Sequence, residues 1–374
     1  MSSKKFRSFG KKVKQVEERR TNARRSSTCS KNQRNFFTPI QNPCCFCRNN
    51  RVEWASRWSA TGLSVFQPLN GGMRMITRRE MLRGSLALGG AALFAPHLFA
   101  AVAVPEDRKF TEQLGWKIGP QIYSFNRFPF DEAIKLVAAC GATSFEQYTG
   151  QKISRDININ VGPDLLKPEN KDALKKVKDL LAEAGCKMHA VGVCGSGKAD
   201  FDFAAEFEIP LLNTEPDFDK NPGVIAEVSK RAEEYKINVG LHNHPKPSRY
   251  WDPDVVLVQL KDASPRVGAC CDTGHWLRSG LNPLECIKKL KGHITGFHIK
   301  DLKKSGNGYD ANCVMGQGEV GIAEILKEVA TYNIKDLPFS IEFEADWDKN
   351  QPSVAECVKF FDATAKQIVV SRRL

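Results

Sequence analysis

The sequence has no apolar run of the roughly 20 residues that a membrane-spanning helix needs. Its most apolar N-terminal stretch, residues 85–95, is shorter than that, contains Gly89 and Gly90, and is followed by Pro96. Because these residues interrupt the run, the sequence predicts no stable membrane span.

Residues 104–374 have no net positive charge. The whole chain has a formal net charge of +12, and residues 1–72 hold 15 Lys or Arg against 3 acidic residues. Residues 73–103 hold 4 and 1. Of the chain's 55 basic and 43 acidic residues, 36 and 39 therefore remain in residues 104–374, a net charge of −3. Since nucleic-acid binding requires a basic surface, we expect no nucleic-acid partner.

Two common motifs are also missing. Cys44, Cys45 and Cys47 have no second ligand pair at a workable spacing, so they do not form a recognisable zinc module. A doubly wound nucleotide-binding sheet would carry a Gly-rich phosphate loop after its first strand. Residues 119–123 read Gly-Pro-Gln-Ile-Tyr, which offers no such loop.

The first 103 residues form two segments outside the predicted fold. Residues 1–72 combine Lys and Arg clusters with little apolar periodicity, so we expect them to be disordered. Residues 73–103 resemble a twin-arginine export signal, with Arg78 and Arg79 before the weakly apolar run and a small-residue cleavage site at residues 101–103.

Export signals of this kind stand at the very N-terminus of a chain. We therefore expect translation to start at Met73 or Met75, with the upstream residues an artefact of the gene prediction. The same resemblance implies export to the periplasm.

The remaining 104–374 segment alternates between short β-type runs and amphipathic helical runs. Eight strands and the helices between them suit a single (β/α)8 barrel, whose usual size is about 250 residues. The predicted strands are 116–125, 144–148, 187–192, 211–215, 238–242, 267–272, 294–299 and 338–343. The predicted helices include 131–140, 170–184, 224–235, 254–261, 283–290 and 322–332.

Two connections are longer than the barrel needs, namely residues 149–169 and residues 301–321. Both follow predicted strands, so they lie on the face of the barrel where active sites form. We expect them to act as lids over that face.

Three successive predicted strands end in side chains that bind metals. Asp272 and His275 follow one apolar run, His298 ends the next, and Glu342 ends the last. Because the carboxyl ends of parallel strands converge at one end of a barrel, these groups are expected to meet there.

The same residues carry a resemblance to a known family. The stretches Asp272-Thr-Gly-His275 and His298-Ile-Lys300-Asp301, with Glu342, resemble the metal-site motifs of the xylose isomerase-like sugar isomerase and epimerase barrels. The resemblance covers roughly residues 114–368. The stretches 242–245 (His-Asn-His-Pro) and 213–217 (Asn-Thr-Glu-Pro-Asp) make the chain most similar to an exported branch whose relatives include enzymes acting on 3-keto sugars.

The resemblance implies a divalent cation bound by Asp272, His298 and Glu342. Many members of the family have a Glu on the fifth strand, where this chain has His242. Glu215, at the end of the fourth strand, is the preferred fourth ligand, and His242 is the alternative. Two carboxylates, one His and a further ligand suit Mn²⁺, Mg²⁺, Co²⁺ or Zn²⁺.

Further residues are assigned to substrate and to catalysis. Strand alternation points His242 and His244 into the barrel, with His244 nearer the mouth and better placed as a general base. The alternative catalytic groups are Glu146 and Lys300. The predicted substrate contacts are His242, His275 and Trp276, and the resemblance also directs Lys300 at substrate oxygens.

These assignments predict an enzyme that removes a proton beside the carbonyl of a small sugar or keto sugar. The outcome is isomerisation or epimerisation, and the alternative is a lyase or hydratase acting on 3-keto sugars or glycosides. Two readings of other classes stay open. One is a sugar-binding barrel without catalysis, and the other is an endonuclease of the apurinic type, which the net charge of −3 disfavours.

Overall fold

The computed structural model describes residues 66–69, 72–75, 104–306 and 308–372. The chain divides into two units, Met1–Ala91 and Ala92–Leu374, and each is described by itself. Among the described residues, no helix combines the length and the apolar character that crossing a membrane requires.

The first unit contains a small antiparallel sheet. Strand β1 (Phe66–Leu69) pairs with β2 (Gly72–Met75). These strands include residues 66–69 and 72 of the segment predicted to be disordered and residues 73–75 of the segment predicted to be an export signal. The rest of residues 1–72, and residues 76–103 of the segment predicted to be an export signal, lie outside the described residues.

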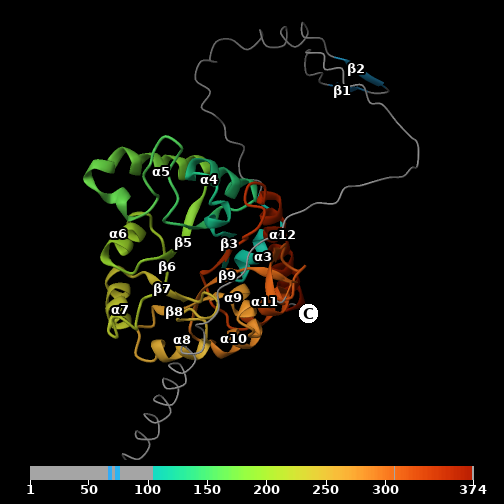
Figure 1. Cartoon of the computed structure of the whole chain (residues 1–374). Helices are drawn as coiled ribbons and strands as arrows, with labels where there is room; N and C mark the ends of the chain where they lie inside the picture. The colour runs from blue at the N-terminus through green and yellow to red at the C-terminus, as the bar shows by residue number, and fades with distance from the viewer. Residues whose placement is uncertain (1–65, 70–71, 76–103, 307, 373–374) are drawn as a thin grey trace, which may run out of the picture. The chain divides into compact units, whose positions relative to one another are not determined.

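The second unit is a barrel of eight parallel strands, as predicted. In Figure 1 the strands form an inner ring and the helices lie outside it. The order around the sheet is β3-β12-β9-β8-β7-β6-β5-β4. The strands are β3 (Trp116–Pro120), β4 (Ser144–Gln147), β5 (Lys187–Cys194), β6 (Leu211–Thr214), β7 (Asn238–His242), β8 (Val267–Asp272), β9 (Ile294–Ile299) and β12 (Leu337–Ile341).

The barrel closes between its first two strands. A single parallel bridge joins Gln121, just after β3, to Glu146 in β4. The closure is therefore looser than the continuous pairing between β12 and β3. It places a buried carboxylate at the closing point.

The helices alternate with the strands along the chain. Gly185 has φ of 61° and ends α5 in the left-handed conformation that glycine adopts without strain. The helices are α3 (Arg108–Gln113), α4 (Phe130–Ala139), α5 (Lys171–Ala184), α6 (Lys198–Glu206), α7 (Val224–Tyr235), α8 (Pro253–Leu260), α9 (Thr273–Arg278), α10 (Pro283–Lys289), α11 (Ile322–Ala330) and α12 (Gln351–Ser371), with 3₁₀ turns η1 (Ile122–Phe125), η2 (Pro163–Leu166) and η3 (Pro168–Asn170).

The first predicted strand is too long at its carboxyl end. It stops at Pro120, and Ile122–Phe125 forms the 3₁₀ turn η1. The side chain of Gln121 accepts a hydrogen bond from the backbone N–H of Tyr123, which starts the turn. This change of direction brings Tyr123 to the mouth of the barrel.

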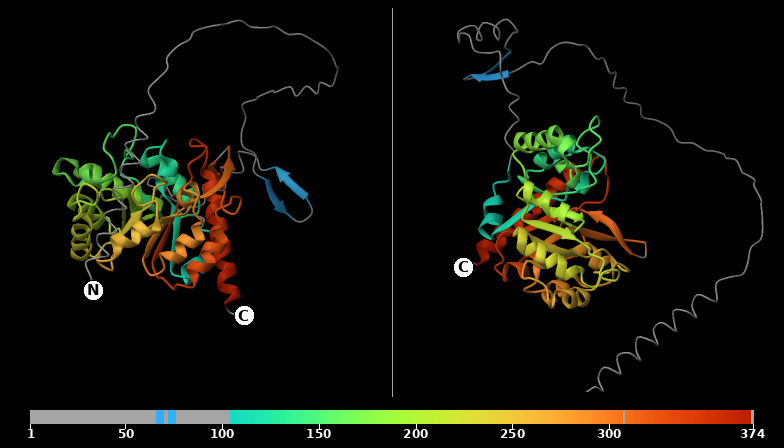
Figure 2. Two further views of the ribbon diagram at one scale, coloured as in Figure 1. Left: turned by 60° about the horizontal axis from the view of Figure 1, so that its bottom comes forward. Right: turned by 90° about the vertical axis from the view of Figure 1, so that its left-hand side faces the viewer.

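The long connection after β9 contains an antiparallel hairpin. Strand β10 (Asp301–Ser305) pairs with β11 (Gly308–Cys313), and the hairpin projects from the barrel in the right-hand view of Figure 2. Its residues are largely polar and exposed, so apolar alternation did not reveal it. The connection lies on the predicted face.

Strand alternation separates an apolar outer layer from a polar lumen. Phe297 in β9 stacks on Phe339 in β12 with ring centroids 4.6 Å apart, and Phe339 meets Phe361 of α12 at 4.9 Å. The next residues, His298 and Ser340, face the opposite side of the sheet. Both are buried, with exposed fractions of 0% and 1%. The hydrophobic core therefore lies between strands and helices, while the lumen holds hydrogen-bonding groups.

Candidate metal centre

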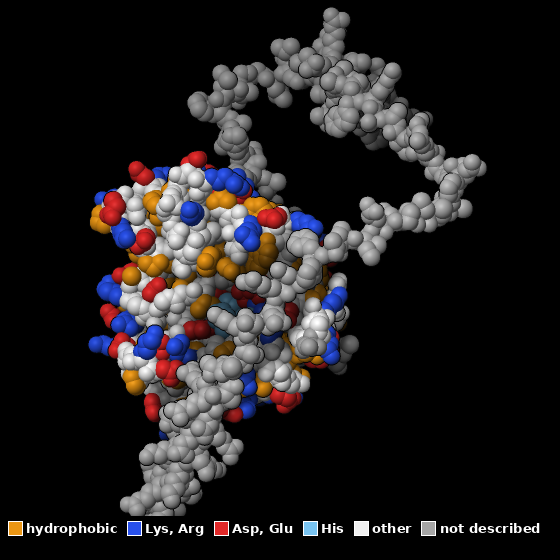
Figure 3. All heavy atoms as spheres, viewed as in Figure 1, with side chains coloured by type: hydrophobic (Ala, Val, Ile, Leu, Met, Phe, Trp, Pro, Cys, Tyr) orange, Lys and Arg blue, Asp and Glu red, His pale blue; other side chains and the backbone are white. Residues whose placement is uncertain are grey.

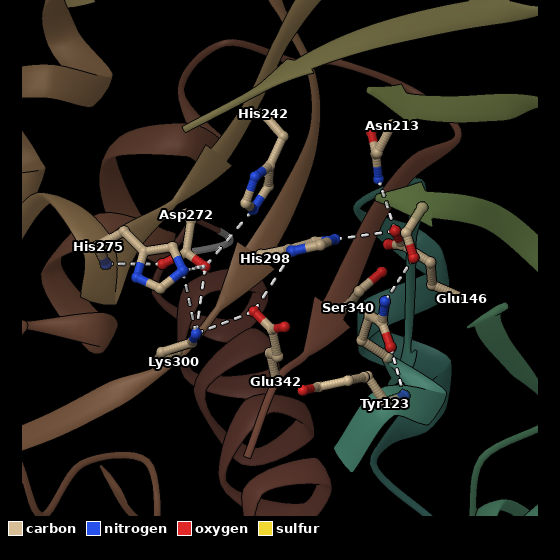
Figure 4. A network of polar contacts seen from close by, with 12 residues as sticks. Tyr123, Glu146, Asn213, His242, Asp272, His275, His298, Lys300, Ser340 and Glu342 are labelled. Atoms are coloured by element: carbon tan, nitrogen blue, oxygen red, sulfur yellow. Dashed lines mark hydrogen bonds and ion pairs between the residues drawn. The ribbon is translucent and has the colours of Figure 1, made fainter. Parts of the chain in front are cut away.

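Four metal-competent side chains meet at the carboxyl ends of neighbouring strands. His242 and Asp272 are the last residues of β7 and β8, His298 is the penultimate residue of β9, and Glu342 follows β12. Figure 4 shows all four directed toward a common point. In Figure 3, histidine and acidic side chains are visible together in a hollow on the face turned to the viewer.

The ligand atoms lie close together. His242 Nε2 is 3.7 Å and His275 Nε2 is 3.5 Å from Asp272 Oδ2. His298 Nδ1 is 3.5 Å from Glu342 Oε2. Ligand atoms of His242, Asp272, His275 and Glu342 all lie within 4.8 Å of one another, a spacing that one ion can bridge.

Two carboxylates hold the outward-facing nitrogens of the histidines. Glu215 Oε1 is 2.8 Å from His242 Nδ1, and Glu146 Oε1 is 2.9 Å from His298 Nε2. A carboxylate on one ring nitrogen fixes the tautomer and directs the other nitrogen. The inward atoms are therefore Nε2 of His242 and Nδ1 of His298.

The inward-facing atoms have no hydrogen-bond partner among the described residues. One oxygen of Asp272 is used, because Oδ1 accepts from the backbone N–H of His275 at 2.7 Å and so begins α9. Buried polar atoms are nearly always paired, so a group of unpaired ones facing each other marks a place for a cation. The atoms of the cluster that lack a hydrogen bond are His242 Nε2, Asp272 Oδ2, His298 Nδ1 and Glu342 Oε2, of which Glu342 Oε2 has Lys300 Nζ 2.9 Å away as an ion-pair partner.

The carboxylates keep their charge although they are buried. Burial raises the pKa of Asp272, but neighbouring His275 and Lys300 lower it further, and the net pKa lies below the ordinary value. Burial likewise opposes ionisation of Glu342, and Lys300 outweighs it. Five carboxylates therefore stand against two fixed cations and against His244 and His298, whose pKa values are raised by Glu215 and Glu146; the small surplus of negative charge would be offset by a divalent cation. The five carboxylates are Glu146, Glu215, Asp272, Glu342 and Glu344, and the two fixed cations are Lys300 and Arg278.

Lys300 is buried beneath the cluster. Its Nζ lies 2.9 Å from Glu342 Oε2 and 2.7 Å from Glu344 Oε2. Burial lowers its pKa, but the carboxylates raise it more, so the amine stays protonated. Its stem runs over Gly274, where an added Cβ would lie 2.5 Å from Lys300 Cγ. The glycine of the Asp-Thr-Gly-His stretch therefore makes room for the lysine.

His244 and Glu215 form a pair at the mouth. The His244 side chain is 48% exposed, and its Nδ1 contacts Glu215 Oε1. This hydrogen bond raises the pKa of His244, and burial only partly offsets it. Burial raises the pKa of Glu215, but bonds from His242 and His244 lower it to about 2. Glu215 therefore stays ionised and favours the protonated form of His244.

A family model described as "Xylose isomerase-like TIM barrel" matches residues 120–364, which run from the end of β3 into α12. The chain belongs to the xylose isomerase-like TIM barrel family. This agrees with the resemblance that its strand-end motifs carry, and with the barrel topology.

The curated relatives of this xylose isomerase-like barrel include dehydratases. An inosose dehydratase of Bacillus cereus (strain AH820) is 24% identical over 187 residues, which are 46% of this chain and 62% of that protein. The chain spans 39% to 62% of the length of the curated relatives that it matches.

Solved structures share the fold. A xylose isomerase-like TIM barrel protein from Mycobacterium smegmatis, in complex with magnesium, is 17% identical with a TM-score of 0.53, covering 68% of this chain and 97% of that one. A D-tagatose 3-epimerase-like protein is 16% identical with a TM-score of 0.52, covering 69% and 99%. At these identities the likeness concerns the fold alone.

Most residues predicted for the site of this xylose isomerase-like barrel are brought together. Glu146 lies behind His298, away from the inward-facing atoms, and is fully buried. Trp276 is placed elsewhere, in the hydrophobic core with 1% exposure, because α9 turns it away from His275. The residues that do meet are Glu215, His242, His244, Asp272, His275, His298, Lys300 and Glu342.

Sequence reasoning missed the residues that support the site. Asn243 pins β7 to β8, donating to the Asp272 carbonyl at 3.0 Å and accepting from the Asp272 N–H at 2.8 Å. Asn213 donates to Glu146 at 3.0 Å. Glu344 joins Lys300 to Arg278, whose Nη1 lies 3.1 Å from its carboxylate. Asn213 and Asn243 lie inside the two stretches quoted for the family resemblance, and Glu344 lies two residues after Glu342, so their positions were the available signal.

Proposed function

We propose that this barrel is a divalent-metal-dependent enzyme that removes a proton beside the carbonyl of a small sugar. The observation that supports it most directly is the set of four buried ligand atoms that face one another, none of them hydrogen-bonded to another described residue and only Glu342 Oε2 in a close ion pair, with Lys300. Such a group is costly in an empty site and stabilising around a cation.

The residues that would hold the ion are His242, Asp272, His298 and Glu342. This assignment differs from the preferred fourth ligand of the sequence, because Glu215 lies against the outer nitrogen of His242. When bound, such an ion polarises a carbonyl oxygen and stabilises negative charge that develops there. Glu215 and Glu146 would hold the two imidazoles in place.

His244 is the general base of the proposed reaction. It is half-exposed at the mouth, 4.7 Å from His242 and 5.2 Å from His275 between ring centroids. Glu215 beside its Nδ1 supports the imidazolium that forms when Nε2 takes a proton. Lys300 is a poor base because carboxylates keep it protonated. It instead neutralises Asp272 and Glu342.

Proton removal leads to more than one product. Return of the proton to a neighbouring carbon or to the other face gives isomerisation or epimerisation, and loss of a hydroxyl from the next carbon gives dehydration. The inosose dehydratase relative supports dehydration as a second candidate, of equal weight with isomerisation. Both reactions use the same base and the same cluster.

Deuterium exchange tests the proposal. Purified protein is incubated with candidate keto sugars in deuterated water and followed by NMR, and deuterium beside the carbonyl is expected, with the product reporting the outcome. His244→Gln should lower exchange roughly 10²-fold or more with the metal retained. His293→Gln, which changes an exposed histidine away from the cluster, is the matched control. Equal exchange in both variants would remove His244 from the role of base.

A further inference from the structure

Three aromatic side chains from separate connections meet at one side of the barrel mouth. Tyr123 follows β3, Tyr148 follows β4, and Trp347 follows β12, three strands that are neighbours around the barrel. The Tyr123 ring lies 4.9 Å from Tyr148 and 5.7 Å from Trp347, nearly perpendicular to both. All three are half-buried rather than enclosed. We call this group the aromatic wall.

The polar ends of the aromatic wall are free. Within the described part of the chain, no hydrogen bond is made by the hydroxyls of Tyr123 and Tyr148 or by the indole N–H of Trp347. Tyrosine and tryptophan at binding surfaces offer an apolar face with a polar end. Free donors on half-buried rings therefore fit a ligand that is apolar on its faces and hydroxylated at its edge.

The aromatic wall adjoins the candidate metal centre. The backbone N–H of Gln121 donates to the Ile341 carbonyl at 2.8 Å, and Ser124 Oγ accepts from the backbone N–H of Phe343 at 2.8 Å. These bonds attach the start of η1 to the residues immediately before and after Glu342. Figure 4 shows the Tyr123 side chain extending toward Glu342. A molecule bound at the cluster would therefore have its neighbouring substituent against this wall.

The connections that carry the wall are fixed. Asn350 donates to the carbonyls of Ser124 at 2.7 Å and Phe343 at 3.4 Å, which ties the Trp347 connection to η1. Gly150 leaves room for the Tyr148 ring, since a Cβ there would lie 2.3 Å from the hydroxyl oxygen. Preorganised side chains lose little entropy when a ligand binds.

A hollow of about 520 Å³ lies beside Trp347. Two acidic and two basic side chains line the hollow, so their formal charges sum to zero. Each of these four side chains can form hydrogen bonds with hydroxyl groups. Of the nearby cations at the cluster, Lys300 and Arg278 are already bound to Glu344. This balance favours a neutral polyhydroxyl group over a phosphate. The lining residues are Arg127, Asp346, Trp347, Asp348 and Lys349.

We propose that the aromatic wall and the adjoining hollow form a second sugar-binding subsite, which takes the neighbouring ring of a neutral glycoside whose reacting ring lies at the metal centre. A sugar ring presents C–H groups on its faces and hydroxyls at its edge, the pattern that the wall matches. This inference rests on the proposed function, because the reacting ring is placed at the proposed centre. It narrows the substrate class from small sugars to glycosides.

Calorimetric titration of the metal-loaded full chain tests the subsite. The probes are neutral disaccharides (cellobiose, maltose, laminaribiose, lactose) and their constituent monosaccharides. At least one disaccharide should bind roughly 10-fold more tightly than its monosaccharides, the scale expected of a good aromatic contact. Trp347→Ala should abolish this difference and leave monosaccharide affinity and metal content unchanged, while Trp347→Phe should keep part of it.

Trp251→Ala is the matched control, because Trp251 lies in another connection, 4.7 Å from Lys246 Nζ. No preference for any disaccharide would overturn the proposal, as would equal weakening of disaccharide and monosaccharide binding by Trp347→Ala. Calorimetry measures binding without turnover, so the proposed subsite can be contradicted independently of the proposed reaction. Absent deuterium exchange with an intact disaccharide preference would count against the proposed reaction alone.

Discussion

At the scale of single residues, the two histidines of the centre differ in the nitrogen that faces inward. His242 presents Nε2 because Glu215 holds Nδ1, and His298 presents Nδ1 because Glu146 holds Nε2. Each carboxylate comes from a different strand than its histidine. Orientation of the ligands therefore depends on pairs that are far apart in the sequence.

The roles of Glu215 and His242 can be separated by metal content. If His242 binds the ion and Glu215 orients it, His242→Ala should lose the metal, whereas Glu215→Gln should weaken binding roughly 10- to 100-fold and keep one ion per chain at saturation. Elemental analysis and a chelator competition measure both quantities. If Glu215→Gln lost the ion and His242→Ala kept it, Glu215 and not His242 would be the fourth metal ligand.

His189 illustrates a buried histidine with a structural role. Its two ring nitrogens lie 3.0 Å from the hydroxyls of Ser144 and Ser340 inside the barrel. Burial lowers its pKa to about 4, and the nearby charge of Glu146 only partly opposes this. The imidazole is therefore neutral in the folded chain at ordinary pH.

The lowered pKa of His189 predicts an acid-dependent loss of stability. The unfolded chain binds a proton near pH 6.5 and the folded chain only near pH 4, so its contribution is complete above pH 6.5 and declines as pH falls to about 4. The loss is at most about 3 kcal/mol. Urea unfolding of wild type and His189→Gln across this window should show a steeper decline for wild type. Parallel declines would contradict the prediction.

At the scale of elements, Asp301 organises the connection after β9. Its Oδ2 accepts from the N–H groups of Gly316 at 2.8 Å and Gly318 at 3.0 Å, and its Oδ1 accepts from Leu302 at 3.0 Å and Val320 at 3.2 Å. One buried carboxylate thus holds the chain on both sides of the hairpin. The close approach needs glycine, since a Cβ at Gly318 would lie 2.1 Å from Asp301 Oδ1.

Removing this carboxylate should loosen the connection locally. In Asp301→Ala, four backbone donors lose a charged acceptor, so amide protection in residues 314–320 should fall by at least about 2 kcal/mol, roughly 30-fold in exchange rate. Hydrogen exchange with mass spectrometry measures this, and the barrel strands should keep their protection. Asp310→Ala, at an exposed position of β11, is the control. Equal protection in both variants would show that Asp301 does not hold the connection.

At the scale of the whole molecule, the barrel contains its own core. The buried apolar residues that pack together run from Leu114 to Val369, all within the second unit. We therefore expect residues 104–374 alone to fold, with the melting temperature and metal content of the full chain. Thermal unfolding and elemental analysis of this fragment give the comparison. A fall in melting temperature of more than about 4 °C, roughly 1 to 2 kcal/mol for a chain of this size, would show that the preceding residues contribute.

The sequence by itself determined the barrel and the end of it that carries the site. Residues 238–242, 267–272 and 294–299 were predicted as strands with the bounds that the structure gives. Runs of β-branched and apolar residues specify buried parallel strands, and parallel strands place their carboxyl ends together. The meeting of Asp272 with His298 follows from that rule.

Tertiary structure alone decided which atoms face one another. The contact of Glu215 with the outer nitrogen of His242, the position of Glu146 behind His298, and the burial of Trp276 depend on side-chain directions and on neighbours from other strands. Such choices differ by a single rotamer or helix turn, which no pattern along the chain encodes. Helix α9 is six residues long, too short to show a helical period, and it fixes the directions of His275 and Trp276.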